Sequence, residues 1–491
     1  MLLGLDLGTS SVKALLMEEN GDAVGEGSAP YEVRAPRPGW AETTPGEWWD
    51  AVLEATGAAV GGRGAGVTAL GLSGQMHGVV LAGQGGSPLR PAVLWADARS
   101  GAELAAYRGL DEDLRRRLAN PPSVGMAGPS LLWLRDNEPG TYASARWALQ
   151  PKDWLRTRLT GEVAAEPSDA SATLLYDLPA DDWSHATLDH LGLRAELLAP
   201  LVSSASVAGE LTAEAAEELG LSRGLPVAAG AADTAAAMLG VGLLRPGPAQ
   251  LTIGTGGQIV TPQESPDVDP HLRTHLYRGG LPGLWYSMAA IQNAGLALEW
   301  VRKLLGVSWS EVYDEAFAVP PGSGGVTFLP YLSGERTPHF DPGARGAWTG
   351  LGLDHTRGHL LRAALEGVAF ALREGLEALE DLGGDDAELR LAGGGASGAG
   401  GGSGDPWRQL LADVLGRPLW LLPDEISAVA SARGAAFLAG LASGVYSSAG
   451  DTLSLTPEPE GSINPGGADY EAAYGRYREL YPKLYGRAPE W

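Results

Sequence analysis

The stretch GLDLGTSSVK, residues 4–13, decides how this chain of 491 residues folds. Its first apolar run predicts a short buried strand, which is followed by a tight turn at Gly8 and Thr9 and by a second apolar run. Asp6 lies inside the first run, where an unpaired charge is expensive. A carboxylate beside a turn rich in N–H groups and hydroxyls suits a magnesium–phosphate group, because the metal binds oxygen atoms and the phosphate binds N–H groups. The alternative is an ordinary hairpin with an acidic residue at its edge.

A second stretch of the same pattern, QLTIGTGGQIV, lies about half-way along the chain at residues 250–260. It again has an apolar run, a Gly-Thr turn and another apolar run. Two such units indicate a duplicated domain whose halves face each other across a cleft. Each turn would then bind one side of the same polyphosphate.

Composition excludes several classes of protein. The formal net charge of −25 argues against a nucleic-acid-binding protein, which needs a positive surface. No apolar run reaches the roughly 18 residues that span a bilayer, and the sequence shows no secretory signal. The absence of cysteine excludes disulfides and thiol catalysis and fits a reducing compartment. We therefore expect a cytoplasmic protein of two or more domains with no membrane or nucleic-acid partner.

Two loops of the first half carry polar groups next to apolar strands. The first, SGQMHG at residues 73–78, is a good place for a small polar ligand, although a hairpin turn with a structural histidine is the alternative. The second places Trp95 ahead of Asp97 and Arg99. An aromatic side chain beside an Asp/Arg pair can stack on and hydrogen-bond a sugar, or the pair can be a surface salt bridge that contributes little.

Asp233 lies where an apolar strand, residues 226–230, runs into a predicted helix. As an N-cap it would stabilise that helix by about 0.5–2 kcal/mol. The same position at the end of a central strand also points into the cleft of an α/β protein, where a catalytic base can be held with fixed geometry.

The best linker signal is LRPGP at residues 244–248, just before the second Gly-Thr unit. We therefore expect an N-terminal domain at 1–244 and a C-terminal domain at 245–445. A helical tail at 446–491 carries a stripe of tyrosines and is expected to pack on the body of the protein.

Taken together, these motifs resemble those of the FGGY family of carbohydrate kinases over essentially the whole chain. The loop at 73–78, the Trp95 segment, PKD at 151–153 and YLSGERTP at 331–338 are each similar to motifs of that family and occur in its order. The resemblance implies an α/β fold with two ribonuclease H-like domains, as in the superfamily of actin, sugar kinases and Hsp70, which face each other across a cleft for ATP and sugar.

The resemblance also implies the reaction and its residues. The activity would be the ATP- and Mg²⁺-dependent phosphorylation of a keto sugar, D-xylulose, to D-xylulose 5-phosphate. Asp233 would be the general base, and Asp6 and Asp233 would be the catalytic and metal-binding carboxylates. The sugar would bind to Gln75, Met76, His77, Trp95, Asp97 and Asp233. The nucleotide and its phosphates would bind to Thr9, Ser10, Lys13, Gly254, Thr255, Gly295, Glu299, Gly394, Gly395 and Ala396.

One segment departs from the pattern of the family. Residues 393–406, GGGASGAGGGSGDP, are several residues longer than the family's turn and lack its arginine, so that they read as a flexible linker. They also contain a formal GxGxxG match at Gly393, Gly395 and Gly398, with Asp424 after the next strand, which would favour a dehydrogenase. That alternative leaves the stretch at residues 4–13 without a role.

Two further alternatives remain open. The chain could be a kinase of the same family for ribulose, fuculose, gluconate or glycerol, because pocket shape decides such cases by only about 1–3 kcal/mol per group. It could also be a non-catalytic sugar sensor or an assembly protein of the same fold. A homodimer is expected from the resemblance alone.

Overall fold

Residues 4–13 form the predicted hairpin in the structure, a computed structural model that describes residues 1–383, 388–393, 404–456 and 458–486. Strand β1 (Leu2–Leu7) pairs antiparallel with β2 (Ser11–Met17) and parallel with β5 (Ala69–Gly74). The described part of the first sheet has the order β11 (Val207–Glu210), β12 (Pro226–Ala228), β5, β1, β2 and β3 (Ala23–Pro30), and β13 (Ala231–Ala232) pairs with β5.

The second Gly-Thr stretch forms the matching hairpin of a second sheet. Strand β14 (Ala249–Ile253) pairs antiparallel with β15 (Gly257–Gln263) and parallel with β20 (Leu389–Ala392). Over the described residues this sheet has the order β16 (His275–Arg278), β17 (Trp285–Ile291), β15, β14, β20, β21 (Leu419–Leu421) and β22 (Gly461–Ile463). In both sheets, two successive antiparallel pairings lie on one side of the first strand and two successive parallel pairings lie on the other. This repeated order confirms the predicted duplicated α/β fold.

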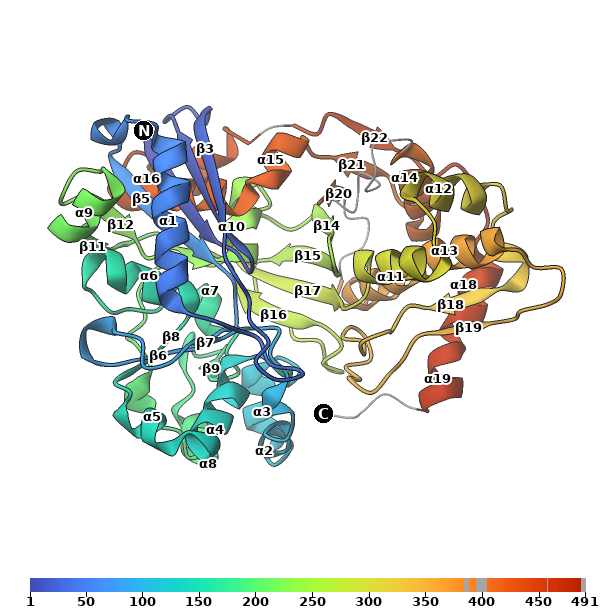
Figure 1. Ribbon diagram of the computed structural model, residues 1–491, viewed down its shortest axis with the longest axis horizontal. Helices are drawn as coiled ribbons and strands as arrows, with labels where there is room; N and C mark the ends of the chain where they lie inside the picture. Colours follow the sequence, from blue (N-terminus) through green and yellow to red (C-terminus); the bar gives the residue numbers. More distant parts are fainter. Residues whose placement is uncertain (384–387, 394–403, 457, 487–491) are drawn as a thin grey trace.

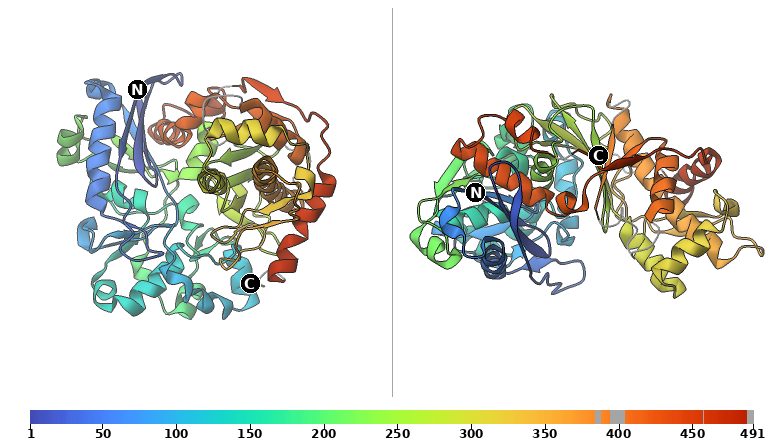
Figure 2. Two further views of the ribbon diagram at one scale, coloured as in Figure 1. Left: turned by 45° about the vertical axis from the view of Figure 1, so that its right-hand side comes forward. Right: turned by 90° about the horizontal axis from the view of Figure 1, so that it is seen from above.

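The two sheets lie in neighbouring lobes (Figure 1), and helices cover each of them. Helix α1 (Pro45–Val60) packs on β2 and β3, and α13 (Arg357–Glu380) packs on β15 and β17. Helix α16 (Ala430–Ser443) comes from the second half of the chain but packs on β1 and β5 of the first sheet. It also packs against α10 (Asp233–Gly240), so this pair of helices joins the two lobes (Figures 1 and 2).

Glycines allow α16 to lie directly on the backbone of its neighbours. A Cβ atom at Gly71 of β5 would lie 1.8 Å from the carbonyl oxygen of Ala435. A Cβ atom at Gly434 of α16 would lie 1.8 Å from the carbonyl oxygen of Ala236 in α10. Both distances are far below van der Waals contact, so the close approach depends on the missing side chains.

The remaining described elements extend the two lobes. In the first lobe they are β4 (Glu42–Thr43), β6 (Val80–Ala82), β7 (Ala92–Val93), α2 (Leu104–Arg108), α3 (Glu112–Leu118), α4 (Ala127–Asn137), α5 (Pro139–Ser144), β8 (Trp147–Leu149), α6 (Pro151–Thr160), α7 (Pro167–Ala170), β9 (Tyr176–Asp177), β10 (Asp182–Trp183), α8 (His185–Leu191) and α9 (Ala213–Leu219). Later in the chain come α11 (Gly295–Leu305), α12 (Trp309–Phe317), β18 (Thr327–Leu329), β19 (Ala347–Thr349), α14 (Gly404–Leu415), α15 (Asp424–Ala428), α17 (Ala449–Leu453), α18 (Glu471–Arg478) and α19 (Leu480–Tyr485).

The C-terminal segment packs on the second lobe. The rings of Tyr474 and Tyr477 in α18 lie 5.6 and 5.5 Å from that of Phe370 in α13. The hydroxyl of Tyr477 also lies 2.9 Å from that of Tyr331. The division of the chain at 244/245 and 445/446 stays a prediction. Within the described ranges, no helix is both long and apolar enough to cross a membrane.

Candidate active site

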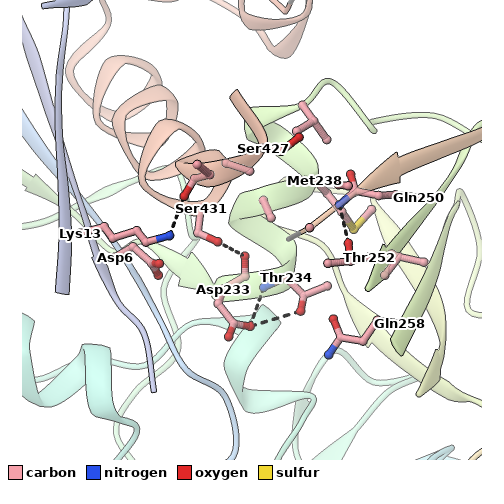
Figure 3. A pocket seen from close by; sticks show the side chains of 17 residues that line it. Asp6, Lys13, Asp233, Thr234, Met238, Gln250, Thr252, Gln258, Ser427 and Ser431 are labelled. Atoms are coloured by element: carbon pink, nitrogen blue, oxygen red, sulfur yellow. Dashed lines mark hydrogen bonds between the residues drawn. The ribbon is translucent and has the colours of Figure 1, made fainter. Parts of the chain in front are cut away.

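A cavity of about 250 Å³ lies between the two sheets (Figure 3). Both lobes and the helices that join them contribute to its wall. The polar residues of this wall are Asp6 and Lys13 of the first hairpin, Asp233 and Thr234 of α10, Gln250 and Thr252 of β14, Gln258 of β15, and Ser427 and Ser431 of α15 and α16. The structure therefore brings together Asp6, Lys13 and Asp233, which are far apart in the sequence.

The carboxylate of Asp6 is held by a residue of the neighbouring strand in the same sheet. The hydroxyl of Ser73 in β5 donates a hydrogen bond to its Oδ1 at 3.0 Å. Burial raises the pKa of Asp6, and the Ser73 hydrogen bond and the charge of Lys13 lower it. The ammonium group of Lys13 itself donates to the carbonyl of Ala428 at 2.6 Å.

Asp233 occupies the start of α10, one position later than an N-cap. The N-cap residue is Ala232, and Asp233 is the first residue of the helix, so the alternative interpretation of Asp233 as the N-cap is wrong. Its Oδ1 accepts hydrogen bonds from the amide and hydroxyl of Thr234 at 2.6 and 3.2 Å (Figure 3). Burial and the nearby charge of Asp6 raise its pKa to about 7.

These two carboxylates suit a magnesium ion. Asp6 and Asp233 line the same cavity, and the charge of Asp6 raises the pKa of Asp233. In the described part of the chain, no group of three or more histidine, aspartate or glutamate side chains could hold a metal. Magnesium commonly takes one or two protein carboxylates and completes its shell with water and substrate phosphates, so the donor set fits.

The turn after β1 is held by hydrogen bonds from three side chains. The indole Nε1 of Trp95 donates to the hydroxyl of Thr9 at 2.9 Å. The side-chain amide of Gln75 donates to the carbonyl of Gly8 at 3.3 Å, and the hydroxyl of Tyr31 donates to the same oxygen. Ser10, next along the turn, is exposed. Two predicted sugar contacts, Gln75 and Trp95, thus support the predicted phosphate turn.

The turn after β14 is held by the start of α11. The amide of Gly295 donates to the carbonyl of Gly254 at 3.0 Å, and that of Leu296 donates to the carbonyl of Thr255 at 2.9 Å. A Cβ atom at Gly295 would lie 2.4 Å from the Gly254 oxygen, so this position needs a glycine. The structure thus places Gly295 beside the second predicted phosphate turn.

Glu299 lies in ion pairs on the side of α11. Its carboxylate contacts Arg302 at 2.7 Å and Lys303 at 3.2 Å, and the hydrogen bond from Arg302 lowers its pKa. Both partners lie on α11 itself, so in this structure the carboxylate of Glu299 forms ion pairs within its own helix. The predicted contacts Gly394, Gly395 and Ala396, and most of the segment 393–406, lie outside the described residues.

Met76 and His77 are buried near the start of α10. The Met76 side chain belongs to the same apolar cluster as Ala232, and the Tyr286 hydroxyl lies 3.8 Å from its sulfur atom. The Nδ1 atom of His77 lies 2.7 Å from the carbonyl of Ala172, and burial lowers the pKa of the imidazole to about 4. Because a carbonyl only accepts, Nδ1 carries the proton and Nε2 is an acceptor.

Trp95 and Asp97 have different surroundings. Trp95 lines a second cavity of about 390 Å³, together with Glu335 and Arg336 of the second lobe. Asp97 is buried, and its oxygens accept hydrogen bonds from the guanidinium of Arg99 at 2.7–2.8 Å and from the amide of Ala41 at 2.6 Å. This arrangement favours a structural role for Asp97.

The sequence interpretation overlooked the polar side chains of the second sheet. Gln250 and Thr252 are two residues apart on β14, and Gln258 follows on β15, so all three face the cavity. Polar residues that alternate with apolar ones in a central strand were the available signal.

Comparison with known proteins gives consistent matches. Family models for the N-terminal and C-terminal domains of the FGGY family of carbohydrate kinases match residues 1–240 and 249–443. The chain is 36% identical over 488 residues to the xylulose kinase of Escherichia coli (strain K12), which covers 99% of this chain and 98% of that protein. The crystal structure of the xylulose kinase from Rhodospirillum rubrum is 31% identical, with a TM-score of 0.87 and coverage of 98% of both chains. The gluconate kinase from Lactobacillus acidophilus is 26% identical, with a TM-score of 0.90 and coverage of 98% of this chain and 97% of that one.

Proposed function

Because the chain belongs to the FGGY family of carbohydrate kinases, and is therefore an ATP-dependent sugar kinase, we propose that it phosphorylates D-xylulose to D-xylulose 5-phosphate. The observation that carries this proposal is the meeting of Asp6, Lys13 and Asp233 in one cavity between the two sheets. Phosphoryl transfer needs in-line placement and neutralised charge, and it needs no covalent intermediate. Two carboxylates and two turns rich in N–H groups supply these requirements.

Asp233 is the general base in this proposal. Its pKa of about 7 leaves a large fraction of the carboxyl ionised at neutral pH and able to take the proton of the attacking hydroxyl. Thr234 holds one carboxylate oxygen and leaves the other, Oδ2, for the sugar. A base placed in this way typically contributes about 10²–10⁴-fold to the rate.

Asp6, with Asp233 opposite, would hold Mg²⁺, which supplies positive charge that neutralises the phosphates when it is bound. The N–H groups of the turns at Thr9 and Thr255 would bind the phosphates, with Ser10 and Gly254 beside them. Lys13 and Ala428 both line the cavity, and the ammonium group of Lys13 donates to the Ala428 carbonyl. When the nucleotide binds, Lys13 would donate to a phosphate oxygen in place of that carbonyl.

The sugar would bind between Met76, His77 and Trp95. Neutral His77 offers Nε2 as an acceptor for a sugar hydroxyl, and Met76 supplies an apolar surface next to the residue that precedes Asp233. The gluconate kinase of the same fold is a reason to test other sugars as well. The cytoplasmic location and the homodimer stay predictions.

The test is a coupled assay of ADP release with MgATP against ketoses, polyols and gluconate. We expect D-xylulose to stimulate ATP consumption and to give the highest kcat/KM of the panel. A higher kcat/KM with ribulose, fuculose, gluconate or glycerol would replace the substrate and keep the mechanism. ATP consumption that no sugar stimulates would contradict the proposal.

The role of Asp6 predicts a change in the magnesium requirement. In the Asp6→Asn variant, we expect the Mg²⁺ concentration for half-maximal activity to rise about 10- to 100-fold, because one anionic ligand is lost. A titration of kcat with Mg²⁺ at saturating sugar measures this shift. The matched control is Asp50→Asn, which changes an exposed aspartate of α1. A normal magnesium requirement in Asp6→Asn would remove Asp6 from the metal site.

A further inference from the structure

A cluster of charged side chains is fully buried behind the candidate active site. The ammonium group of Lys152 in α6 contacts the carboxylates of Asp153, Glu166 and Asp169 at 2.8, 3.0 and 2.9 Å. Arg156 of the same helix contacts Asp153 at 2.9 Å, and none of these five side chains is more than 1% exposed. Buried ion pairs are often no more stable than an apolar core, so stability alone does not explain such a cluster.

Glu166 links the ion pairs to Ser168. The Ser168 hydroxyl donates to the Glu166 carboxylate, with both oxygens at 2.8 Å. The proton of the Ser168 hydroxyl therefore points toward Glu166, and the lone pairs of its oxygen point away from Glu166. The Ser204 hydroxyl donates to the same carboxylate at 2.6 Å. Lys152 in turn fixes Glu166, so the direction of the Ser168 lone pairs is set by the ion pairs.

Those lone pairs accept a hydrogen bond from the backbone beside Asp233. The amide of Ala232, the N-cap of α10, donates to the Ser168 hydroxyl at 2.9 Å. A second contact from the cluster holds the segment between β12 and β13, because Arg156 donates to the carbonyl of Ala229 at 2.7 Å. The cluster thus holds the chain on both sides of the bend at Gly230, where φ is +85°.

We propose that Ser168, oriented by Glu166 and Lys152, is a positioning residue that fixes the place of Asp233 relative to the bound sugar. This inference rests on the proposed role of Asp233 as the base. The chain of contacts runs from a buried ammonium through a carboxylate and a hydroxyl to the peptide next to the reacting side chain. A displacement of about 1 Å in such a group lowers the rate about 10²-fold, so small errors here are costly.

The experiment compares two serines that bind the same carboxylate. Ser168→Ala and Ser204→Ala each remove one hydroxyl that donates to Glu166, but only Ser168 contacts Ala232. We expect Ser168→Ala to lower kcat about 10- to 100-fold with little change in the KM for sugar or ATP. We expect Ser204→Ala to keep a kcat close to that of the wild type. Ser168→Ala should also lose more thermal stability than Ser204→Ala, because the buried amide of Ala232 is left without its partner. A kcat loss at unchanged KM, in a protein that stays folded at the assay temperature, separates positioning from a general loss of structure.

A second variant keeps the inference testable if Ser168→Ala does not fold. Ser168→Cys keeps the size of the side chain but replaces the hydroxyl with a weaker acceptor, so its kcat should lie between those of the wild type and Ser168→Ala. Equal kcat in the two alanine variants, or a loss confined to KM, would overturn the inference while the kinase activity and the role of Asp233 stand. An Asp233→Asn variant as active as the wild type would overturn the role of the base and the inference with it.

Discussion

Replacing Asp233 by asparagine is expected to lower kcat about 10³-fold, within the range of about 10²–10⁴ that a positioned base contributes. Asparagine keeps the size of the side chain and can still accept from Thr234, but it takes no proton from the sugar. The magnesium requirement should rise, as in Asp6→Asn, because an anionic ligand is lost. At saturating Mg²⁺ the KM for ATP should change little, because Asp6 and both phosphate turns remain. Initial rates at saturating D-xylulose and MgATP measure the effect. Activity within a few-fold of the wild type would show that another group is the base.

The same variant is expected to be more stable than the wild type at alkaline pH. The pKa of Asp233 rises from an ordinary value of 3.8 to about 7 on folding, so the native state holds a proton more tightly than the unfolded chain. The stability of the wild type therefore falls as pH rises from about 4 to about 7 through this group. The neutral asparagine removes the buried charge, so Asp233→Asn should have a Tm about 2–4 °C higher at about pH 8 without MgATP.

This difference in Tm should disappear as the pH falls below about 4, where both states of the wild type are protonated. Asp50→Asn, which changes an exposed aspartate, should show no such difference at any pH. Scanning calorimetry of the three proteins across this range makes the comparison. A Tm for Asp233→Asn at or below that of the wild type at alkaline pH would mean that the carboxylate is not destabilised by burial.

Adding one methyl group at Gly434 is expected to destabilise the protein by about 3 kcal/mol. The new Cβ would lie 1.8 Å from the carbonyl oxygen of Ala236, a backbone atom of α10 that has no side-chain freedom to move away. Helices α10 and α16 would have to separate. Asp233 begins α10, and its carbonyl accepts a hydrogen bond from Ser431 of α16 at 3.1 Å, so kcat should fall as well.

Gly57→Ala is the matched control for Gly434→Ala. Gly57 is also inside a helix, α1, but a Cβ atom there would meet nothing within 4 Å. Alanine is the better helix former by about 1 kcal/mol, so Gly57→Ala should raise the free energy of unfolding by about that amount. Denaturant unfolding of both variants measures the two effects. A Gly434→Ala protein as stable as the wild type would show that α10 and α16 are not in backbone contact.

The hairpins and the two central carboxylates were predictable because their signals are local. A charge inside an apolar strand at Asp6, and another at a strand–helix junction at Asp233, each stand out within a few residues of sequence. Local signals did not show that Asp6 lines the cavity whereas Asp97 has a structural role. Asp97 accepts a hydrogen bond from the amide of Ala41, and Arg99 forms an ion pair with Glu42. Both partners lie more than fifty residues earlier in the chain, so only the fold reveals these contacts.

The sheet that α16 covers could not be predicted from the sequence. An apolar face shows that a helix is buried but not which sheet it covers. The glycines inside β1 and β5 were the available signal, because glycine in a strand often marks close approach of another backbone. Glu299 shows a simpler omission, since Arg302 and Lys303 lie three and four residues later on the same helix and were readable as partners.

The position of α16 has a consequence for recombination between related genes. A hybrid that joins residues 1–244 of this chain to the second half of a relative would place a foreign helix on the first sheet. That helix would have to present equally small side chains to Gly4 and Gly71, where the native backbone leaves no room for a Cβ atom. The two halves are therefore not interchangeable parts, and viable crossovers are those that inherit the first sheet and its covering helix from one parent.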